Sequence, residues 1–283
     1  MTTPPSGGDI RRVVVLLDAS RASRTALVEA AELAARSGAE LIGLFVEEED
    51  LLRSAALPFA RELGPTSGAL RPLDPARIER RLRAQARELQ HLLQGMTRRY
   101  AITASLQVAR GRVVTQALAY ISPGDLIVVG KTGWSSLRRR RLGSTARHLI
   151  GEASLTVMVM EQGGGAEAQP TMVLFDHPEA GLRALEMAAR IAHRDSRILT
   201  VLLPPADPDT LDSLRRQAES WLQARDLAAK VQVLGGLAAE TVAQAVRSGN
   251  GRALVVSRTS PALAGEAGSR LIEAVGPPVV VVP

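Results

Sequence analysis

The chain has 283 residues, of which 46% are apolar and none is cysteine. This length suits two domains of ordinary size, and the missing cysteines exclude a disulfide framework, a thiolate metal site and a cysteine nucleophile. No apolar run approaches the roughly 20 residues that span a bilayer, and the N-terminus lacks the apolar core of a signal peptide. We therefore expect a soluble, cytoplasmic protein without a membrane partner.

Positive charge is concentrated in the first half of the chain. The net charge is +6, and residues 1–163 hold 23 of the 35 Lys and Arg but only 16 of the 29 Asp and Glu. Three Phe, two Trp and two Tyr leave few platforms on which single-stranded nucleic acid could stack. A small polyanion is therefore a simpler partner for the basic half than nucleic acid.

The first predicted elements alternate between strand and helix. Residues 13–17 and 41–46 are continuous apolar runs, typical of parallel strands that are buried on both faces. Between them, Ser20 or Ser23 is placed to cap a helix that ends at Gly38. Strand, helix and strand in this order predict a parallel sheet with a right-handed crossover.

Residues 47–73 interrupt this alternation. They contain an acidic patch at residues 47–50, a short helix expected around residues 51–63, and a turn-rich GPTSG sequence. A segment this long between regular elements is either mobile or a functional lid. The helix that follows is marked by Asp74 as its cap and Pro75 at its first position, and the arginines on its polar face are typical of a solvated surface.

The rest of the first half returns to the alternating pattern. We expect strands at residues 104–108, 125–129 and 155–160, and helices at residues 112–121 and 144–152. The sequence GGGAEAQP, residues 163–170, has the composition of a linker. A first domain of residues 10–162 therefore ends before it.

The second half repeats the plan of the first. Strands are expected at residues 171–175, 198–203, 231–234, 253–256 and 279–282, with helices at residues 180–193, around 211–222, at 238–247 and from Gly268 onward. An internal duplication on this scale predicts a second domain, residues 170–283, with the fold of the first.

Residues 127–150 carry the clearest functional pattern. A buried strand ends at Gly130, Gly133 follows, and Gly143 and Ser144 open the next helix. A glycine at the end of a strand lets a ligand approach the main chain, and the free N–H groups of a helix's first turn favour an anion. The loop is therefore a predicted phosphate-binding site.

The second copy of this loop has lost most of the pattern. Ser257 and Ser260 replace Gly130 and Gly133, and only Gly268 with its following serine survives. We therefore expect one competent site per chain, in the first half.

Asp18 at the end of the first strand, together with Gly130-x2-Gly133-x9-Gly143-Ser144, resembles the pattern of the universal stress protein family in its tandem two-domain form. The resemblance covers essentially the whole chain. It implies an α/β fold of two Rossmann-like, adenine nucleotide alpha hydrolase-like domains, each with a five-stranded, mostly parallel sheet flanked by helices. Because family members with this glycine pattern bind ATP, it also implies an ATP-binding regulatory protein of the stress response, and it leaves open whether Mg²⁺ accompanies the nucleotide.

The resemblance also implies roles for individual residues. It places Gly130, Gly133, Gly143 and Ser144 around the phosphates, with Thr145 beside them. Asp18 is expected near the adenine and ribose, and the backbone of Val46 near the base.

Charged residues of the loop are further candidates for the predicted site, and Asp18 and the glycines each have a simpler explanation that needs no ligand. Lys131 and the four arginines at residues 138–141 are candidates for neutralising phosphate charge, although the arginines also fit a solvated loop. Asp18 fits a mere cap on the first helix, and the glycines fit tight turns without a ligand.

No catalytic residue and no metal ligand are assigned from the sequence. The chain lacks a GxxxxGK[ST] phosphate loop, an HExxH zinc site, a GxSxG nucleophile elbow and the protein-kinase motifs. The four histidines, at positions 91, 148, 177 and 193, show no metal-ligand spacing. A slow adenine-nucleotide hydrolase stays open as an alternative, although nothing identifies a general base.

A second alternative is a scaffold of the same fold that binds no nucleotide. Residues 156–160 and 278–282 form the last strand of each copy, and in the family this strand pairs domains. The two halves would then form an intramolecular pseudo-dimer, or two chains a homodimer.

Overall fold

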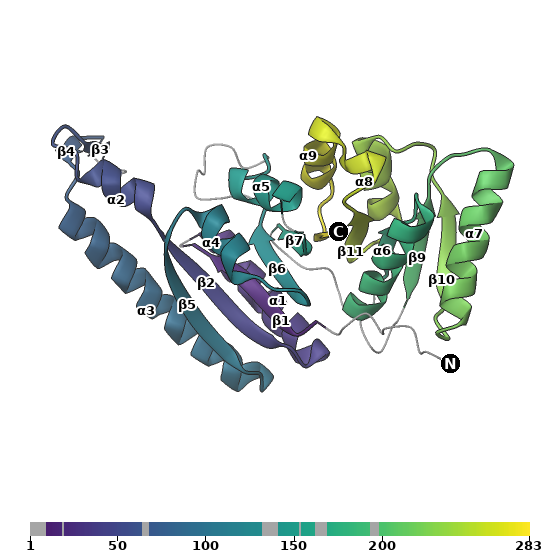
Figure 1. Cartoon of the computed structure of the whole chain (residues 1–283), viewed down its shortest axis with the longest axis horizontal. Coiled ribbons are helices and arrows are strands. Elements are labelled where there is room, and N and C mark those ends of the chain that lie inside the picture. The colour runs from purple at the N-terminus through teal and green to yellow at the C-terminus, as the bar shows by residue number, and fades with distance from the viewer. Residues whose placement is uncertain are drawn as a thin grey trace.

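Ten strands from both halves of the chain form one twisted sheet, with helices on both of its faces (Figure 1). The computed structural model describes residues 10–18, 20–63, 68–131, 141–152, 154–161, 169–192 and 198–283. The strand order is β10-β9-β8-β11-β12-β7-β6-β1-β2-β5, so each half supplies five neighbouring strands in equivalent order. The predicted α/β class and the duplication are confirmed.

The first half supplies the strands β1 (Arg12–Leu17), β2 (Glu40–Glu48), β5 (Ala104–Gly111), β6 (Asp125–Gly130) and β7 (Thr156–Met160). Its helices are α1 (Arg21–Ser37), α2 (Glu49–Ala55), α3 (Pro75–Tyr100), α4 (Val113–Tyr120) and α5 (Ser144–Glu152). Within the large sheet, the neighbouring strands of this half run parallel. The predicted caps are confirmed, because Ser20 caps α1, Gly38 ends it in the left-handed region, and Asp74 caps α3.

The second half supplies β8 (Thr171–Leu174), β9 (Leu199–Leu203), β10 (Ala229–Val233), β11 (Ala253–Ser257) and β12 (Val279–Val282). Its helices are α6 (Pro178–Ile191), α7 (Pro208–Gln223), α8 (Ala239–Ser248) and α9 (Gly265–Ala274), with a short 3-10 helix at Pro261–Leu263. These strands are also mutually parallel.

The two halves meet at the last strand of each. Strands β7 and β12 pair antiparallel, with Val157 opposite Val281 and Val159 opposite Val279. Because β7 and β12 each have strand neighbours on both sides, the edges of the large sheet are β5 and β10. Neither last strand therefore has an open edge for a strand of another chain.

Each face of the sheet is covered by four of the helices, two from each half of the chain. Helices α1, α3, α6 and α7 pack their apolar side chains into one core cluster, and α4, α5, α8 and α9 pack into the other. The strands between these layers are buried on both faces, as in Val13, Val14 and Val15, which are fully inaccessible to solvent. None of the described helices combines the length and apolar character needed to cross a membrane.

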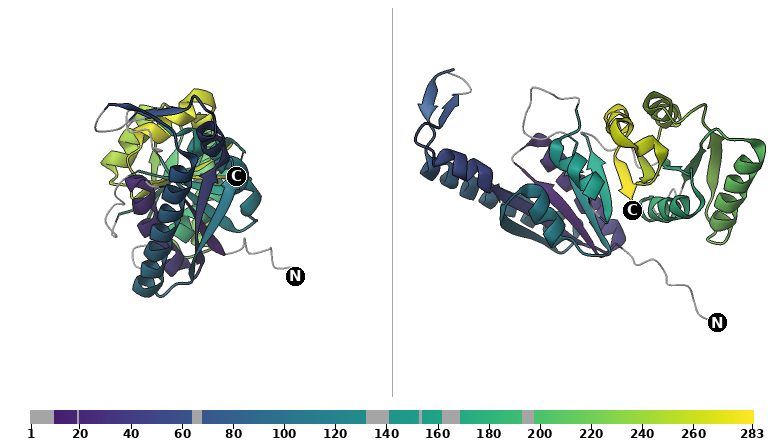
Figure 2. Two further views of the ribbon diagram at one scale, coloured as in Figure 1. Left: turned by 90° about the vertical axis from the view of Figure 1, so that its left-hand side faces the viewer. Right: turned by 45° about the horizontal axis from the view of Figure 1, so that its top comes forward.

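The segment after β2 differs from the prediction. The short helix begins two residues earlier than expected and ends at Ala55, and a two-stranded hairpin follows, formed by β3 (Arg61–Leu63) and β4 (Leu70–Pro72). The hairpin stands at the end of the molecule farthest from the second half (Figure 2). Periodicity missed it because its strands have three residues each.

Candidate functional site

A crevice opens at the carboxyl ends of β1 and β6, at the centre of the first half's sheet. Strand β1 lies between β2 and β6, and the helices that follow β1 and β6, α1 and α5, pack on opposite faces. The chain therefore leaves these two strands in opposite directions. In open α/β sheets this switch point is where ligands bind.

The crevice contains a cavity of about 350 Å³. The structure brings six of the eight predicted site residues to its lining, namely Asp18, Val46, Gly130, Gly143, Ser144 and Thr145. They come from β1, β2, β6 and the start of α5, which are distant in sequence and adjacent in the sheet. The parallel arrangement explains this convergence, because it places the carboxyl ends of these strands, and with them the start of the helix that follows β6, at one edge of the sheet.

Asp18 stands directly after β1, but it does not cap the helix that follows. Ser20 is the N-cap of α1 and accepts a hydrogen bond from the backbone N–H of Ser23 at 3.1 Å. The Asp18 carboxylate instead accepts one hydrogen bond from the backbone N–H of Ser20, at 2.9 Å to Oδ1. This contact orients the carboxylate at the cavity, and the described residues offer Oδ2 no hydrogen-bond donor.

The backbone of Val46 is open to the crevice because β2 continues beyond the end of its neighbour β1. Strand β1 pairs with β2 only as far as Leu17 opposite Phe45, whereas β2 continues beside β5 to Glu48 opposite Gly111. Beyond Phe45, the side of β2 that faces β1 has no strand partner. The peptide groups around Val46 are therefore available to a planar, hydrogen-bonding ligand.

The other end of the cavity is formed by the start of α5. Gly143 precedes the helix, Ser144 and Thr145 are its first residues, and the backbone N–H of Gly143 donates to the carbonyl of Lys131 at 2.9 Å. The N–H groups of the first turn have no partners within the helix. Together with the helix dipole and the hydroxyls of Ser144 and Thr145, they favour an anionic group there.

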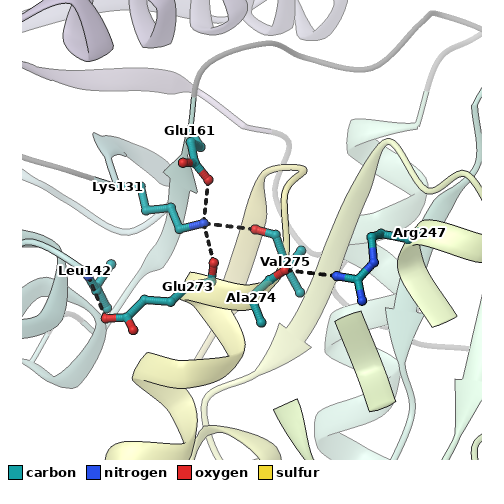
Figure 3. Close-up of polar contacts among 7 residues, drawn as sticks. All are labelled: Lys131, Leu142, Glu161, Arg247, Glu273, Ala274 and Val275. Atoms are coloured by element: carbon teal, nitrogen blue, oxygen red, sulfur yellow. Dashed lines mark hydrogen bonds and ion pairs between the residues drawn. The ribbon is translucent and has the colours of Figure 1, made fainter. Parts of the chain in front are cut away.

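The structure does not bring Lys131 to the cavity lining. Its side chain is buried, and its ammonium forms an ion pair with Glu161 and hydrogen bonds to backbone carbonyls of the second half (Figure 3). This placement gives no support to a role for Lys131 in neutralising phosphate charge. Gly133 and residues 138–140 of the arginine run lie outside the described residues.

Several residues of the cavity lining were not predicted. Glu48 ends β2, Leu51 lies on α2, Leu82 and Gln85 lie on α3, and Val113 lies on α4. They come from elements that border the crevice only after the whole half has folded. A partial signal was available, since residues 47–73 leave β2 at the carboxyl edge where the other site residues gather.

The corresponding region of the second half contains buried side chains that form hydrogen bonds. Asp176 follows β8 as Asp18 follows β1, and Ser260 Oγ donates a hydrogen bond to Asp176 Oδ2. Ser257 and Ser260 are buried, and Ser257 Oγ shares a hydrogen bond with Thr259 at 3.0 Å. Where the first half has Gly130 beside a cavity, the second half has the buried Ser257 bonded to Thr259, and Ser260 bonded to Asp176.

Gly268 is retained in the second half for a packing reason. Helix α9 begins at Gly265, so Gly268 lies inside its first turn, whereas Gly143 lies just before α5. The expectation that α9 starts at Gly268 is therefore wrong. A Cβ at Gly268 would lie 2.4 Å from the carbonyl oxygen of Leu263, so only glycine fits against the preceding 3-10 helix.

Asp176 gives a testable pH dependence of stability. Burial raises the pKa of its carboxyl, although the hydrogen bond from Ser260 and the nearby His177 oppose the rise, and Oδ1 has no hydrogen-bond partner among the described residues. The native protein therefore binds this proton more tightly than the unfolded chain. Its contribution to stability is present at acidic pH, below the unfolded pKa, and is lost as pH rises through the native pKa.

Asp176→Asn should therefore gain free energy of unfolding relative to wild type as pH rises from the acidic range to neutrality. Urea unfolding of both proteins at a series of pH values measures this difference. A difference that stays constant, or that shifts in favour of wild type as pH rises, would contradict the assignment.

In the described part of the chain, side chains that could bind a metal ion do not gather into a site. No group of three or more His, Asp or Glu side chains there has an arrangement that would hold a metal ion. His148 lies one turn into α5 and is exposed, and its Nδ1 lies 2.7 Å from the carbonyl oxygen of Ser144. It therefore contacts its own helix, and His193 lies outside the described residues.

Comparison with solved structures supports the fold over the full length. The chain is similar to a universal stress protein from Archaeoglobus fulgidus, with 17% identity, a TM-score of 0.75, and coverage of 97% of this chain and 96% of that chain. It is also similar to a putative universal stress protein from Pseudomonas aeruginosa, with 14% identity, a TM-score of 0.56, and coverage of 96% and 93%. At these identities the likeness shows the fold alone.

A further solved structure is a universal stress protein in complex with cAMP, which is 22% identical with a TM-score of 0.36, covering 55% of this chain and 100% of that chain. Comparison with curated protein sequences finds no match. The model of the universal stress protein family matches residues 9–161, more than half of the chain and the half that contains the cavity. The protein therefore belongs to the universal stress protein family.

Proposed function

We propose that the protein binds one molecule of ATP per chain in the first-half cavity and acts as a nucleotide-dependent regulator of the stress response in the cytoplasm. The observation that carries the proposal is the convergence of Asp18, Val46, Gly130, Gly143 and Ser144 on one cavity at the switch point of the sheet. Its volume, about 350 Å³, lies within the range of roughly 300–1,000 Å³ that small-molecule sites occupy.

The two ends of the cavity suit the two ends of the nucleotide. Open peptide groups at Val46 and the oriented carboxylate of Asp18 suit the adenine and the ribose hydroxyls. Gly130, Gly143 and the first turn of α5 suit the phosphates, with Ser144 and Thr145 as further donors. Gly133 stays in the proposal on the sequence pattern alone.

The cavity itself offers little to a metal ion. Asp18 and Glu48 are the carboxylates of its lining, so any Mg²⁺ would be held mainly by the phosphates of the nucleotide. No described residue of the lining stands out as a general base for hydrolysis, and we assign no catalytic residue.

In this proposal the two halves of the chain have different roles. Residues 10–162 form the nucleotide-binding domain, and residues 170–283 form a second domain, in which Ser260 donates a hydrogen bond to Asp176 at the corresponding place. We further propose that the pairing of β7 with β12 makes the chain an intramolecular pseudo-dimer. A homodimer of such chains would use a surface other than these two strands.

Calorimetric titration of nucleotide-free protein with ATP tests the proposal. We expect saturable binding with one ATP per chain, and we expect purified protein that retains nucleotide to release an adenine nucleotide on denaturation, identified by its mass. Folded wild-type protein that does not bind ATP would contradict the proposal and favour the scaffold alternative.

A further inference from the structure

Both ends of the glycine loop are fastened to the second half of the chain. The loop leaves β6 at Lys131 and returns at Leu142, and both residues hydrogen-bond to the C-terminal end of α9 (Figure 3). We infer that Lys131 and Glu273 are positioning residues, through which the second half holds the phosphate end of the site in its binding geometry. This inference rests on the proposed nucleotide site and assigns the degenerate half a part in ATP affinity.

Lys131 forms the first attachment. Its Nζ lies 2.6 Å from Glu161 Oε2, 2.9 Å from the carbonyl oxygen of Glu273 and 3.1 Å from that of Val275. An ammonium group has three N–H donors, and these three acceptors use all of them. The last carbonyls of a helix lack partners and lie at the negative end of its dipole, so a buried cation is stabilised there.

Glu273 forms the second attachment. Its Oε1 accepts a hydrogen bond from the backbone N–H of Leu142 at 2.8 Å, one residue before Gly143. The carbonyl of Lys131 accepts from the N–H of Gly143, and the N–H of Lys131 donates to the carbonyl of Met160 at 2.6 Å. The start of the loop, its end and the C-terminal end of α9 are thus joined in one network of hydrogen bonds.

The position of this network explains how it acts on a ligand that it does not touch. Gly130 and Gly143, which line the cavity, are the direct neighbours of Lys131 and Leu142. Holding these neighbours in place fixes the separation of the two glycines and the direction of the first turn of α5. A preorganised site loses less conformational entropy when the nucleotide binds.

A reciprocal contact runs from the second half to the first. Arg258 occupies the position that corresponds to Lys131, its backbone N–H donates to the carbonyl of Val282 at 2.7 Å, and its Nη2 donates to the carbonyl of Leu155 at 3.0 Å. Leu155 precedes β7, so each half sends one basic side chain across the β7–β12 junction. The contact of Lys131 is the one that adjoins the cavity containing Asp18 and Gly130.

ATP affinity of four variants tests the inference. Glu273→Ala removes the acceptor for Leu142 and should raise the ATP Kd about tenfold, the ratio expected for loss of a hydrogen bond to a charged group. Lys131→Met should also raise the Kd. Glu273→Gln keeps an acceptor oxygen and should stay near the wild-type Kd.

The matched control is Arg247→Gln. Arg247 Nη1 contacts the carbonyl of Ala274, also at the end of α9 but from within the second half (Figure 3). This variant perturbs the same helix end without touching the loop, so its ATP Kd should equal that of wild type. Hydrogen exchange without nucleotide gives an independent readout: the Leu142 amide should exchange faster in Glu273→Ala and not in Arg247→Gln.

The experiment distinguishes failure of the positioning role from failure of the proposed ATP binding. If wild type binds ATP and both Glu273→Ala and Lys131→Met bind it with the wild-type Kd, the positioning role is overturned while the proposed function stands. If folded wild type does not bind ATP, the proposed function fails and the inference fails with it. An equal loss of affinity in Arg247→Gln would mean that only the general stability of α9 matters, which also overturns the positioning role.

Discussion

Gly130→Val should abolish ATP binding, with a Kd raised at least about 100-fold, equivalent to about 2.7 kcal/mol. Gly130 is the last residue of β6 and lines the cavity where the phosphates are proposed to lie. Valine suits a strand, so the fold should persist while the two new methyl groups occupy space that the phosphates need. Calorimetric titration of the folded variant with ATP measures the loss.

Ser257→Ala is the matched control for this change, because Ser257 holds the corresponding place at the end of β11. It should bind ATP with the wild-type Kd, since the second half is not proposed to hold nucleotide. ATP binding by Gly130→Val within about threefold of wild type would contradict the proposed position of the phosphates.

Arg12→Met should lower the free energy of unfolding by about 3 kcal/mol, because it leaves a buried carboxylate without its cation. Arg12 and Asp125 are opposite one another at the start of β1 and β6, and the Asp125 side chain is only 2% exposed. Arg12 Nε donates to Asp125 Oδ1 at 2.8 Å, and Nη2 contacts Oδ2. The pair aligns the two strands whose other ends carry Asp18 and Gly130.

Urea unfolding of wild type and variant measures this loss. The exposed neighbour is the control, since Arg11→Met should change the free energy of unfolding by less than about 0.5 kcal/mol. An effect of Arg12→Met no larger than that of the control would show that solvent replaces the lost cation at Asp125.

Much of the fold could be predicted because local signals agree with the tertiary structure. Buried parallel strands such as β1 require unbroken apolar runs, and the ends of α1 follow from Ser20 and Gly38, whose conformations are dictated by the cap positions. Because of the duplication, the same order of strands and helices could be predicted twice, once in each half. Those signals lie within short stretches of sequence, where periodicity and capping act.

The hairpin and the start of α9 could not be predicted in the same way. Strands β3 and β4 have three residues each, too few for a period, and α9 begins at Gly265, so that Gly268 lies inside the helix and packs against the carbonyl of Leu263. The second of these depends on contact between two elements. No pattern within a single helix encodes it.

The site shows the same division. Asp18 and Gly130 could be placed beside the cavity because they lie at strand ends, which the alternating pattern reveals. Lys131 could not, because an ammonium suits phosphate and helix carbonyls equally well, and only the approach of α9 decides between them. Likewise, the hydrogen bond from Ser260 to Asp176 joins residues that are 84 positions apart in sequence, so no local pattern predicts it.

A crystal structure of the protein grown with ATP would locate the nucleotide directly. We expect one nucleotide in the first-half cavity, with its adenine beside the backbone of Val46, its ribose near Asp18 and its phosphates at Gly130, Gly143 and the first turn of α5. We expect no nucleotide beside Asp176. ATP bound in the second half, or a first-half cavity that stays empty at saturating ATP, would contradict the proposed site.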